Sequence, residues 1–150
     1  MYEKYNLVLR SFAGVAFLHK RWKQLCLGNL YTTTIHAINS CVLKLSKLTR
    51  AAKVYRGFQG SMLPAQFWSK NEFNVAGGCE YGFTSTTTDR AQAMHYAQGC
   101  ASTVMEMQMG MVDRGAELSW VSQYPHEAEI LCACQMLSTT HRPTASPRPR

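Results

Sequence analysis

Apolar residues recur at helical spacing through the first third of the chain. The pattern predicts helices over 3–13, 15–27 and 35–48. Gly28-Asn29 is typical of a helix end, and Thr32 to Thr34 supply hydroxyls that can cap the third helix. The third helix carries a stripe of aliphatic residues on one face, which predicts contact with the core: Ile35, Ile38, Val42, Leu45 and Leu48.

From residue 53 onward the pattern changes to short β-rich runs separated by turns. The predicted strands cover 53–57, 80–85, 102–107, 117–121 and 128–134. Short helices are predicted over 63–68 and over 89–98, and Gly77-Gly78 predicts a turn. Asp89 should cap the second short helix, with Gln92 completing a capping box. Helices first and strands afterwards favour an α+β fold over a doubly wound α/β sheet.

With 150 residues and 46% hydrophobic composition, the chain has the size and the apolar content of one domain. We predict a domain over 1–137, made of a helical part over 1–52 and a core over 53–137. Residues 138–150 hold three of the five prolines and no apolar periodicity, which predicts a disordered tail. No stretch is apolar and long enough for a membrane span.

The six cysteines include no Cys-x-x-Cys pair. Cys132 and Cys134 alternate in an apolar strand, where they are expected to act as small hydrophobic residues. A zinc site that combines them with His126 is disfavoured, because no second Cys/His pair has metal spacing, and we expect no metal. Without a signal peptide, a reducing and cytoplasmic location is expected.

The net charge of +7 is unevenly distributed. Residues 1–53 carry nine basic and one acidic side chain, whereas residues 54–134 carry four basic and eight acidic ones. A uniformly basic chain would suggest nucleic acid. Here the acidic second segment would repel a phosphate backbone and favours a cationic target, so no nucleic-acid partner is expected.

Three polar motifs lie on or beside separate predicted strands: Arg56-Gly57, the run Gly82 to Thr87, and Glu127-Ala128-Glu129. A guanidinium can pair with phosphate in a fork geometry, and a following glycine allows close approach to the backbone. Ser85 lies too early to cap the next helix and can bind a carboxylate. Glu129 begins an otherwise buried strand and therefore needs a partner.

Each motif also has a simpler interpretation. Arg56 could be an exposed strand arginine before a turn. Thr87 to Asp89 could be only a hydroxyl-rich turn that caps a helix, and Glu127 and Glu129 could be surface acids. These alternatives stay open for each motif alone.

Taken in order, the three motifs resemble the arginine–serine–glutamate class of mono-ADP-ribosyltransferases over residues 54–131. The Glu-x-Glu form is similar to the family that modifies arginine. Further similarities follow the same order: Leu63-Pro64, Phe67-Trp68, the alanines of helix 89–98, Val104 to Met107, and Gly115-Ala116. The resemblance implies a helical segment packed on a split mixed or antiparallel sheet, with NAD as substrate and no metal.

The resemblance also assigns roles on the NAD side of the site. It implies that Arg56 binds the phosphate and ribose side of NAD, and that the backbone of Gly57 holds the nicotinamide amide. Ser85 would orient the catalytic glutamate, and Thr86 and Thr87 would shape the site.

On the acceptor side, the resemblance divides the work between two glutamates. Glu129 would bind the 2′-hydroxyl of the nicotinamide ribose, whereas Glu127 would orient the acceptor guanidinium and take its proton. Tyr124 and Glu127 would lie on the loop that meets the partner, a target protein with an exposed arginine.

The resemblance fails after the last predicted strand. The family continues into further core strands, whereas Cys132 to Gln135 leads here into the Pro/Arg/Ser tail. We therefore expect an open sheet edge or a truncated or alternatively spliced form. Two rival functions remain at this stage. One is an NAD glycohydrolase of the same fold, and the other is an inactive interaction module that binds through its basic helices.

Overall fold

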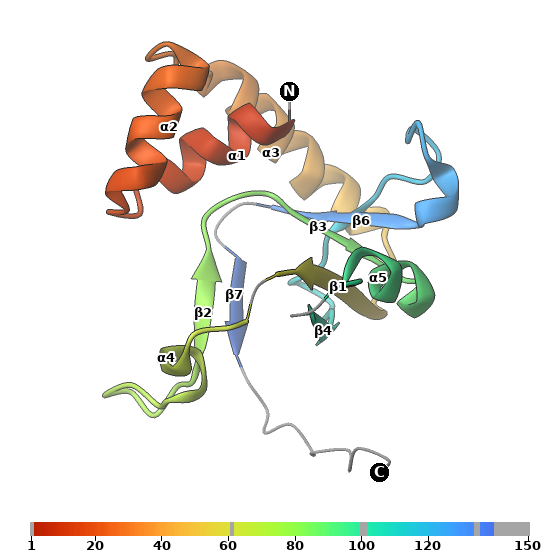
Figure 1. The fold of residues 1–150 in the computed structure, drawn as a ribbon. Helices are drawn as coiled ribbons and strands as arrows, with labels where there is room; N and C mark the ends of the chain where they lie inside the picture. The colour runs from red at the N-terminus through yellow and green to blue at the C-terminus, as the bar shows by residue number, and fades with distance from the viewer. Residues whose placement is uncertain (1, 61, 100–101, 134–135, 140–150) are drawn as a thin grey trace.

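The structure, a computed structural model, describes residues 2–60, 62–99, 102–133 and 136–139. Its first part is a layer of three helices and one 3-10 turn: α1 Tyr2–Ser11, α2 Ala16–Cys26, α3 Thr32–Leu45 and η1 Ser46–Leu48. In Figure 1 these helices lie together on one side of the strands. Two shorter helices follow, α4 Ala65–Trp68 and α5 Arg90–Tyr96.

The sequence predicts the ends of the long helices only in part. α2 ends at Cys26, just before the predicted stop, and Leu27 and Gly28 follow it with φ values of 51° and 79° in the left-handed region. α3 begins at Thr32, so the three threonines lie inside the helix rather than capping it. The Asn29 side chain accepts the backbone N–H of Tyr31 instead. The aliphatic stripe on α3 is buried or half-buried from Ile35 to Leu45, as predicted, but Leu48 is 82% exposed.

Five strands form the main sheet, in the order β4-β1-β3-β6-β5 with every pair antiparallel. They are β1 Lys53–Gln59, β3 Thr84–Thr87, β4 Ser102–Gln108, β5 Ala116–Glu117 and β6 Glu129–Cys132. A second sheet pairs β2 Gly77–Glu80 with β7 Met136–Thr139. The α+β class is confirmed, and the described strands are antiparallel rather than mixed.

Three predicted strand and turn positions were wrong. Gly77-Gly78 lies in β2 and pairs with β7 rather than turning the chain. The strand predicted over 117–121 is only two residues long, because the carbonyl of Leu118 accepts the N–H groups of Val121 and Ser122 in a turn. The strand predicted over 80–85 is interrupted between Glu80 and Thr84.

The predicted tail is also corrected at its start. Ser138 and Thr139 lie in β7, because antiparallel pairing with Gly77 and Gly78 draws them into the second sheet. A strand therefore follows β6, although none was expected there. The rest of the predicted tail, 140–150, lies outside the described residues, and so does Cys134.

Side chains of α1 cause the interruption between β2 and β3. Asn6 is buried, accepts the N–H of Phe83 at 2.7 Å and donates to its carbonyl at 3.2 Å. One turn later, Arg10 forms two hydrogen bonds to Glu80, at 2.9 and 3.1 Å. An added Cβ on Gly82 would lie 2.9 Å from the Asn6 side-chain oxygen, so a larger residue there would have to displace the Asn6 or Arg10 side chain. α1 therefore fixes the segment that leads directly into β3.

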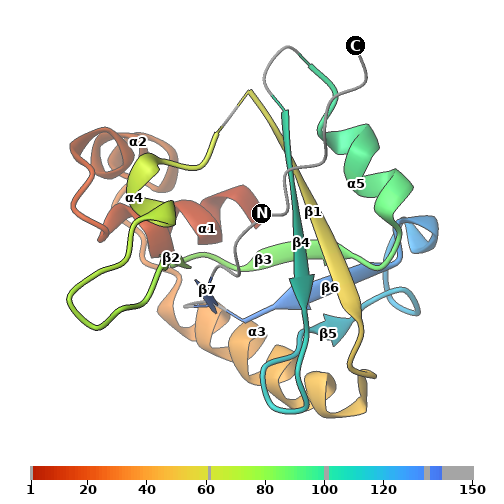
Figure 2. The same cartoon turned by 90° about the horizontal axis from the view of Figure 1, so that it is seen from below.

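The main sheet is split between β1 and β3. These strands share a single pair, Tyr55 with Thr87. A continued ladder would pair Gly57 with Ser85, but the strands separate there instead. Figure 2 shows β1 and β4 crossing β3 and β6 at a steep angle, with α5 beside β1. The split leaves room between two strands that each carry one of the motifs.

Candidate active site

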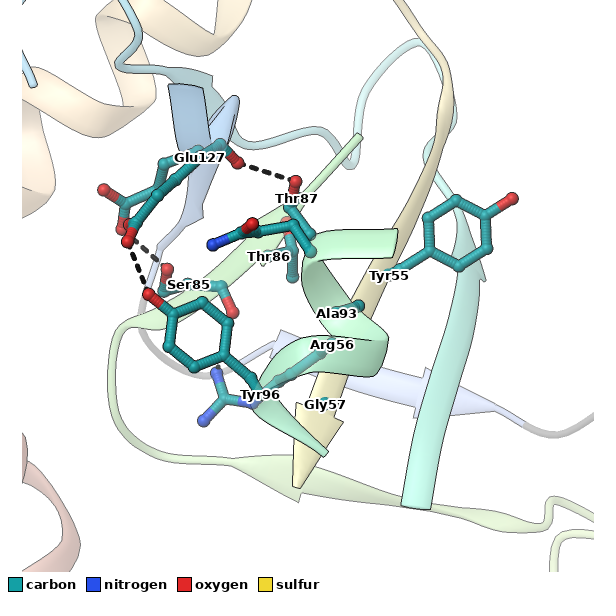
Figure 3. Close-up of a pocket in the computed structure, with 11 residues that line it drawn as sticks. Tyr55, Arg56, Gly57, Ser85, Thr86, Thr87, Ala93, Tyr96 and Glu127 are labelled. Carbon is teal, nitrogen blue, oxygen red and sulfur yellow. Dashed lines mark hydrogen bonds between the residues drawn. The ribbon is translucent and has the colours of Figure 1, made fainter. Parts of the chain in front are cut away.

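A pocket of about 290 Å³ lies where β1 and β3 separate (Figure 3). Its walls come from β1, β3, α5 and the chain entering β6. The lining residues are Tyr55, Arg56, Gly57, Ser85, Thr86, Thr87, Gln92, Ala93, Tyr96, Glu127 and Glu129. The structure therefore brings together seven of the eight site residues that the sequence predicts, and Tyr124 is the exception.

The bond between Ser85 and Glu129 is the central contact of this pocket. The hydroxyl of Ser85 donates to a carboxylate oxygen of Glu129 over 2.6 Å. Glu129 pairs with Thr87 across the β3–β6 ladder, so Ser85 is its diagonal neighbour. The carboxylate is half-buried and has the partner that the sequence required, and the charge-assisted bond fixes its orientation.

The two threonines serve the backbone rather than the pocket interior. The hydroxyl of Thr86 donates to the carbonyl of Ile130 at 2.8 Å. The hydroxyl of Thr87 donates to the carbonyl of Glu127 at 2.7 Å and accepts the N–H of Asp89 at 2.9 Å. Asp89 caps α5 as predicted, because its side chain accepts the N–H of Ala91. The capping box would have the Gln92 side chain accept the N–H of Asp89, but the hydroxyl of Thr87 takes this role. Together these bonds fasten the glutamate turn to β3.

The backbone between the two glutamates is strained. η2 Pro125–Glu127 leads into Ala128, which has a φ of 46° in the left-handed region. That conformation costs an alanine roughly 1–2 kcal/mol. The carbonyl of Ala128 accepts the N–H of Thr88, which helps to hold the turn in place. Glu127 and Glu129 both line the pocket, Glu127 from the end of this turn and Glu129 from the first position of β6.

Arg56 closes the opposite side of the pocket. Its guanidinium donates to the carbonyl of Ser85 at 3.2 Å and stacks 5.1 Å from the ring centre of Phe58. These contacts aim a permanent positive charge at the opening between the strands. The pKa of Glu80 depends on its burial, on its hydrogen bonds and on the charges beside it. Burial raises it, but the hydrogen bonds from Arg10 and Gly82 and the charges of Arg10 and Arg56 hold it below its ordinary value.

The structure gives a second reason for the glycine at position 57. A Cβ there would lie 2.1 Å from the carbonyl oxygen of Ala93, so glycine is needed for α5 to pack on β1. The sequence analysis explained this glycine by the close approach of a ligand to the backbone, whereas the neighbour in the structure is α5. Gly57 still lines the pocket through its backbone.

Four lining residues were not among the site residues predicted from the sequence: Tyr55, Gln92, Ala93 and Tyr96. Gln92 and Tyr96 lie one turn apart on the face of α5 that borders the pocket. The hydroxyl of Tyr96 donates to the carboxylate of Glu127 in a short hydrogen bond (Figure 3). The buried alanines Ala93 and Ala97 mark the side of α5 that faces β1, so helical spacing could have identified Tyr96.

Tyr124 lies away from the pocket. It is 53% exposed and its ring packs edgewise on His126, 6.1 Å between centres. It precedes η2 in the chain, so it lies on the same exposed loop as Glu127.

Cysteine and metal predictions concern other parts of the chain. Cys132 is buried in β6, as expected, and its burial raises the pKa of the thiol. Within the described ranges, no three His, Cys, Asp or Glu side chains lie close enough together to hold a metal ion. Among the described helices, none has the length and apolar character needed to cross a membrane.

The comparisons with known proteins rest on structure rather than sequence. No family model matches the chain. No curated protein sequence matches it either. The structure is similar to exoenzyme S from Pseudomonas aeruginosa, solved in complex with human 14-3-3 protein beta and bound to carba-NAD. The match has a TM-score of 0.51 and 21% sequence identity, and it covers 89% of this chain and 56% of exoenzyme S.

The fold is therefore similar to that of exoenzyme S. At this level of identity the likeness concerns the fold alone, and the chain spans little more than half the length of exoenzyme S. The α+β class expected from the sequence is thus confirmed, and the fold is consistent with the type that the motifs suggested.

Proposed function

We propose that this chain transfers ADP-ribose from NAD to the guanidinium of an arginine on a target protein, with release of nicotinamide. The observation that carries the proposal is the hydrogen bond from Ser85 to Glu129 inside a pocket closed by Arg56. The likeness in fold to exoenzyme S, which was solved with the NAD analogue carba-NAD, supports NAD as the substrate.

The side chains of the pocket fit the chemistry of NAD. A carboxylate held by a serine can accept a hydrogen bond from a ribose hydroxyl, and Glu129 has such a serine at 2.6 Å. A guanidinium can pair with phosphate oxygens through two parallel N–H bonds, and Arg56 uses one donor on the carbonyl of Ser85. The split between β1 and β3 exposes both groups to the same cavity.

Glu129 would act on charge that develops during the reaction. Loss of nicotinamide leaves a positively charged, oxocarbenium-like ribose. A carboxylate fixed in advance stabilises that charge more than it stabilises the neutral sugar, so the barrier falls. Ser85 and the β3–β6 ladder hold the carboxylate in place beforehand, which avoids reorganisation at the moment of bond breaking.

Glu127 would serve the acceptor. A guanidinium is protonated at neutral pH and is a poor nucleophile. A second carboxylate beside the pocket can orient it and accept its proton as the new bond to the ribose forms. Glu127 lies on the outer turn of the pocket, where a protein side chain can approach, and the acidic charge of residues 54–134 suits a cationic target.

The test is direct. Purified chain is incubated with NAD and a protein acceptor rich in exposed arginine, and the modified residue is mapped by mass spectrometry. The proposal expects ADP-ribose on arginine, and expects lysine substitution of the mapped arginine to remove it. Cleavage of NAD that leaves all ADP-ribose free in solution would favour a glycohydrolase and contradict transfer.

A further inference from the structure

Glu127 differs from Glu129 in how the fold holds its side chain. Glu129 belongs to a strand, whereas Glu127 ends a 3-10 turn on the outer rim of the pocket. A glutamate side chain has three rotatable bonds, and fixing it costs conformational entropy. Something must therefore hold the Glu127 carboxylate over the pocket if it is to meet an acceptor.

Tyr96 is placed to do this. It projects from the last turn of α5, and its hydroxyl donates a short hydrogen bond to Oε1 of Glu127 (Figure 3). α5 is itself fixed against β1 by the contact between Gly57 and Ala93, so the tyrosine stands on a rigid support. The carbonyl of Glu127 is held separately by Thr87. The backbone and the carboxylate of Glu127 thus have different anchors.

The bond leaves Glu127 able to bind a guanidinium. A carboxylate has about four lone-pair positions on two oxygens, and Tyr96 occupies one of them. Hydrogen bonding to Glu127 first, then burial, raises the pKa of the Tyr96 phenol. Tyr96 therefore remains a donor at neutral pH and does not compete for the proton of the acceptor.

We infer that Tyr96 is a positioning residue that holds the Glu127 carboxylate toward the pocket, and thereby favours transfer to a guanidinium over release of ADP-ribose to water. The inference rests on the proposed function, since it concerns the acceptor step of the same site. Glu129, which serves cleavage of NAD in both reactions, accepts the hydroxyl of Ser85, whereas the hydroxyl of Tyr96 donates to Glu127.

The variant that tests this is Tyr96→Phe, which removes one hydroxyl and keeps the ring. We measure nicotinamide release with and without agmatine, a small guanidino acceptor. The ratio of the two rates should fall about tenfold, the effect of one hydrogen bond to a charged group. The matched control is Tyr81→Phe, which removes a hydroxyl outside the pocket and should leave the ratio as it is.

An equal fall of both rates in Tyr96→Phe, or no change in the ratio, would overturn the inference while leaving the proposed function intact. Absence of nicotinamide release from the unmutated chain would instead contradict the proposed function. A second measurement needs no turnover: the phenol of Tyr96 is titrated by NMR with labelled tyrosine. Replacement Glu127→Gln should lower its pKa, and an unchanged titration would show that the two groups are not bonded.

Discussion

Two glutamates separated by a single alanine meet the same pocket, but the fold treats them differently. Glu129 begins β6, pairs with Thr87 across a ladder and accepts the hydroxyl of Ser85. Glu127 ends a 3-10 turn and depends on Tyr96 from a helix on the other side of the pocket. Each carboxylate accepts one hydroxyl, but the backbone of Glu129 is part of the sheet, whereas that of Glu127 is held by the hydroxyl of Thr87. The fixed charge of Glu129 suits the cleavage of a small substrate, whereas the position of Glu127 at the rim of the pocket suits contact with a protein acceptor.

The largest effect is expected when the sheet-held carboxylate is neutralised. Glu129→Gln keeps the shape and should lower nicotinamide release by roughly 10²–10³-fold, with and without acceptor, because a preorganised charge at the reacting centre is lost. Steady-state rates measure this. Thermal unfolding controls for the fold, and a variant that keeps its cleavage rate would show that Glu129 is no catalytic residue.

Removal of the rim carboxylate should separate the two reactions. In Glu127→Ala, transfer to agmatine should fall by roughly 10²-fold, since the group that orients the guanidinium and takes its proton is gone. Some cleavage of NAD by water should persist, because water needs no such clamp. Equal loss of both activities would contradict the division between the glutamates.

Arg56 lies opposite both glutamates and should act on NAD binding. Arg56→Ala removes charge-assisted bonds of about 1.5–3 kcal/mol, which corresponds to roughly ten- to a hundredfold weaker binding of NAD. Titration calorimetry with carba-NAD measures it without turnover. The control is Arg90→Ala on α5, whose side chain is exposed and outside the pocket lining. Unchanged affinity in Arg56→Ala would refute the role.

Gly57→Ala tests whether α5, and with it Tyr96, is held by close packing. The added Cβ would lie 2.1 Å from the carbonyl of Ala93, so the helix must shift. Overpacking of this kind costs roughly 1–3 kcal/mol of unfolding free energy. Urea denaturation measures the loss. If the variant is as stable as the unmutated chain, α5 does not rest on β1 as described.

The smallest effect concerns α1, which fixes the entry to β3 and so supports Ser85. The pKa of Glu80 is depressed, so its contribution to stability is complete at neutral pH and is lost as the pH falls below about 4.3. The pair is one-third exposed, and Arg10→Gln should therefore cost no more than about 1 kcal/mol at pH 7. That difference should shrink progressively as the pH falls and Glu80 becomes protonated in the folded protein. Arg21→Gln, which breaks an exposed pair with Glu3, should change little at either pH.

The sequence was a good guide wherever local pattern and local structure agree. Helical spacing located the three long helices, and the need of Glu129 for a partner pointed to Ser85. The sequence indicated that Thr87 could belong to the turn that caps α5, two residues away, but it did not reveal the bond from Thr87 to the carbonyl of Glu127, which is 40 residues away.

Other features depend on distant parts of the chain that no local pattern reports. The break between β2 and β3 comes from Asn6, 77 residues away from Phe83 in sequence. The pairing of β2 with β7 turned a predicted Gly-Gly turn into a strand. Tyr96 lay within a predicted helix, but its partner Glu127 is 31 residues further along. Tertiary contact decided each of these positions.

The most direct test of the account compares nicotinamide release from NAD, with and without agmatine, in the unmutated chain and in Glu127→Ala. The account predicts that agmatine raises release by the unmutated chain and has no effect on Glu127→Ala, which retains acceptor-independent cleavage. Stimulation by agmatine that persists in Glu127→Ala, or a folded unmutated chain that releases no nicotinamide, would contradict the claim that the two glutamates divide the work of ADP-ribosyl transfer.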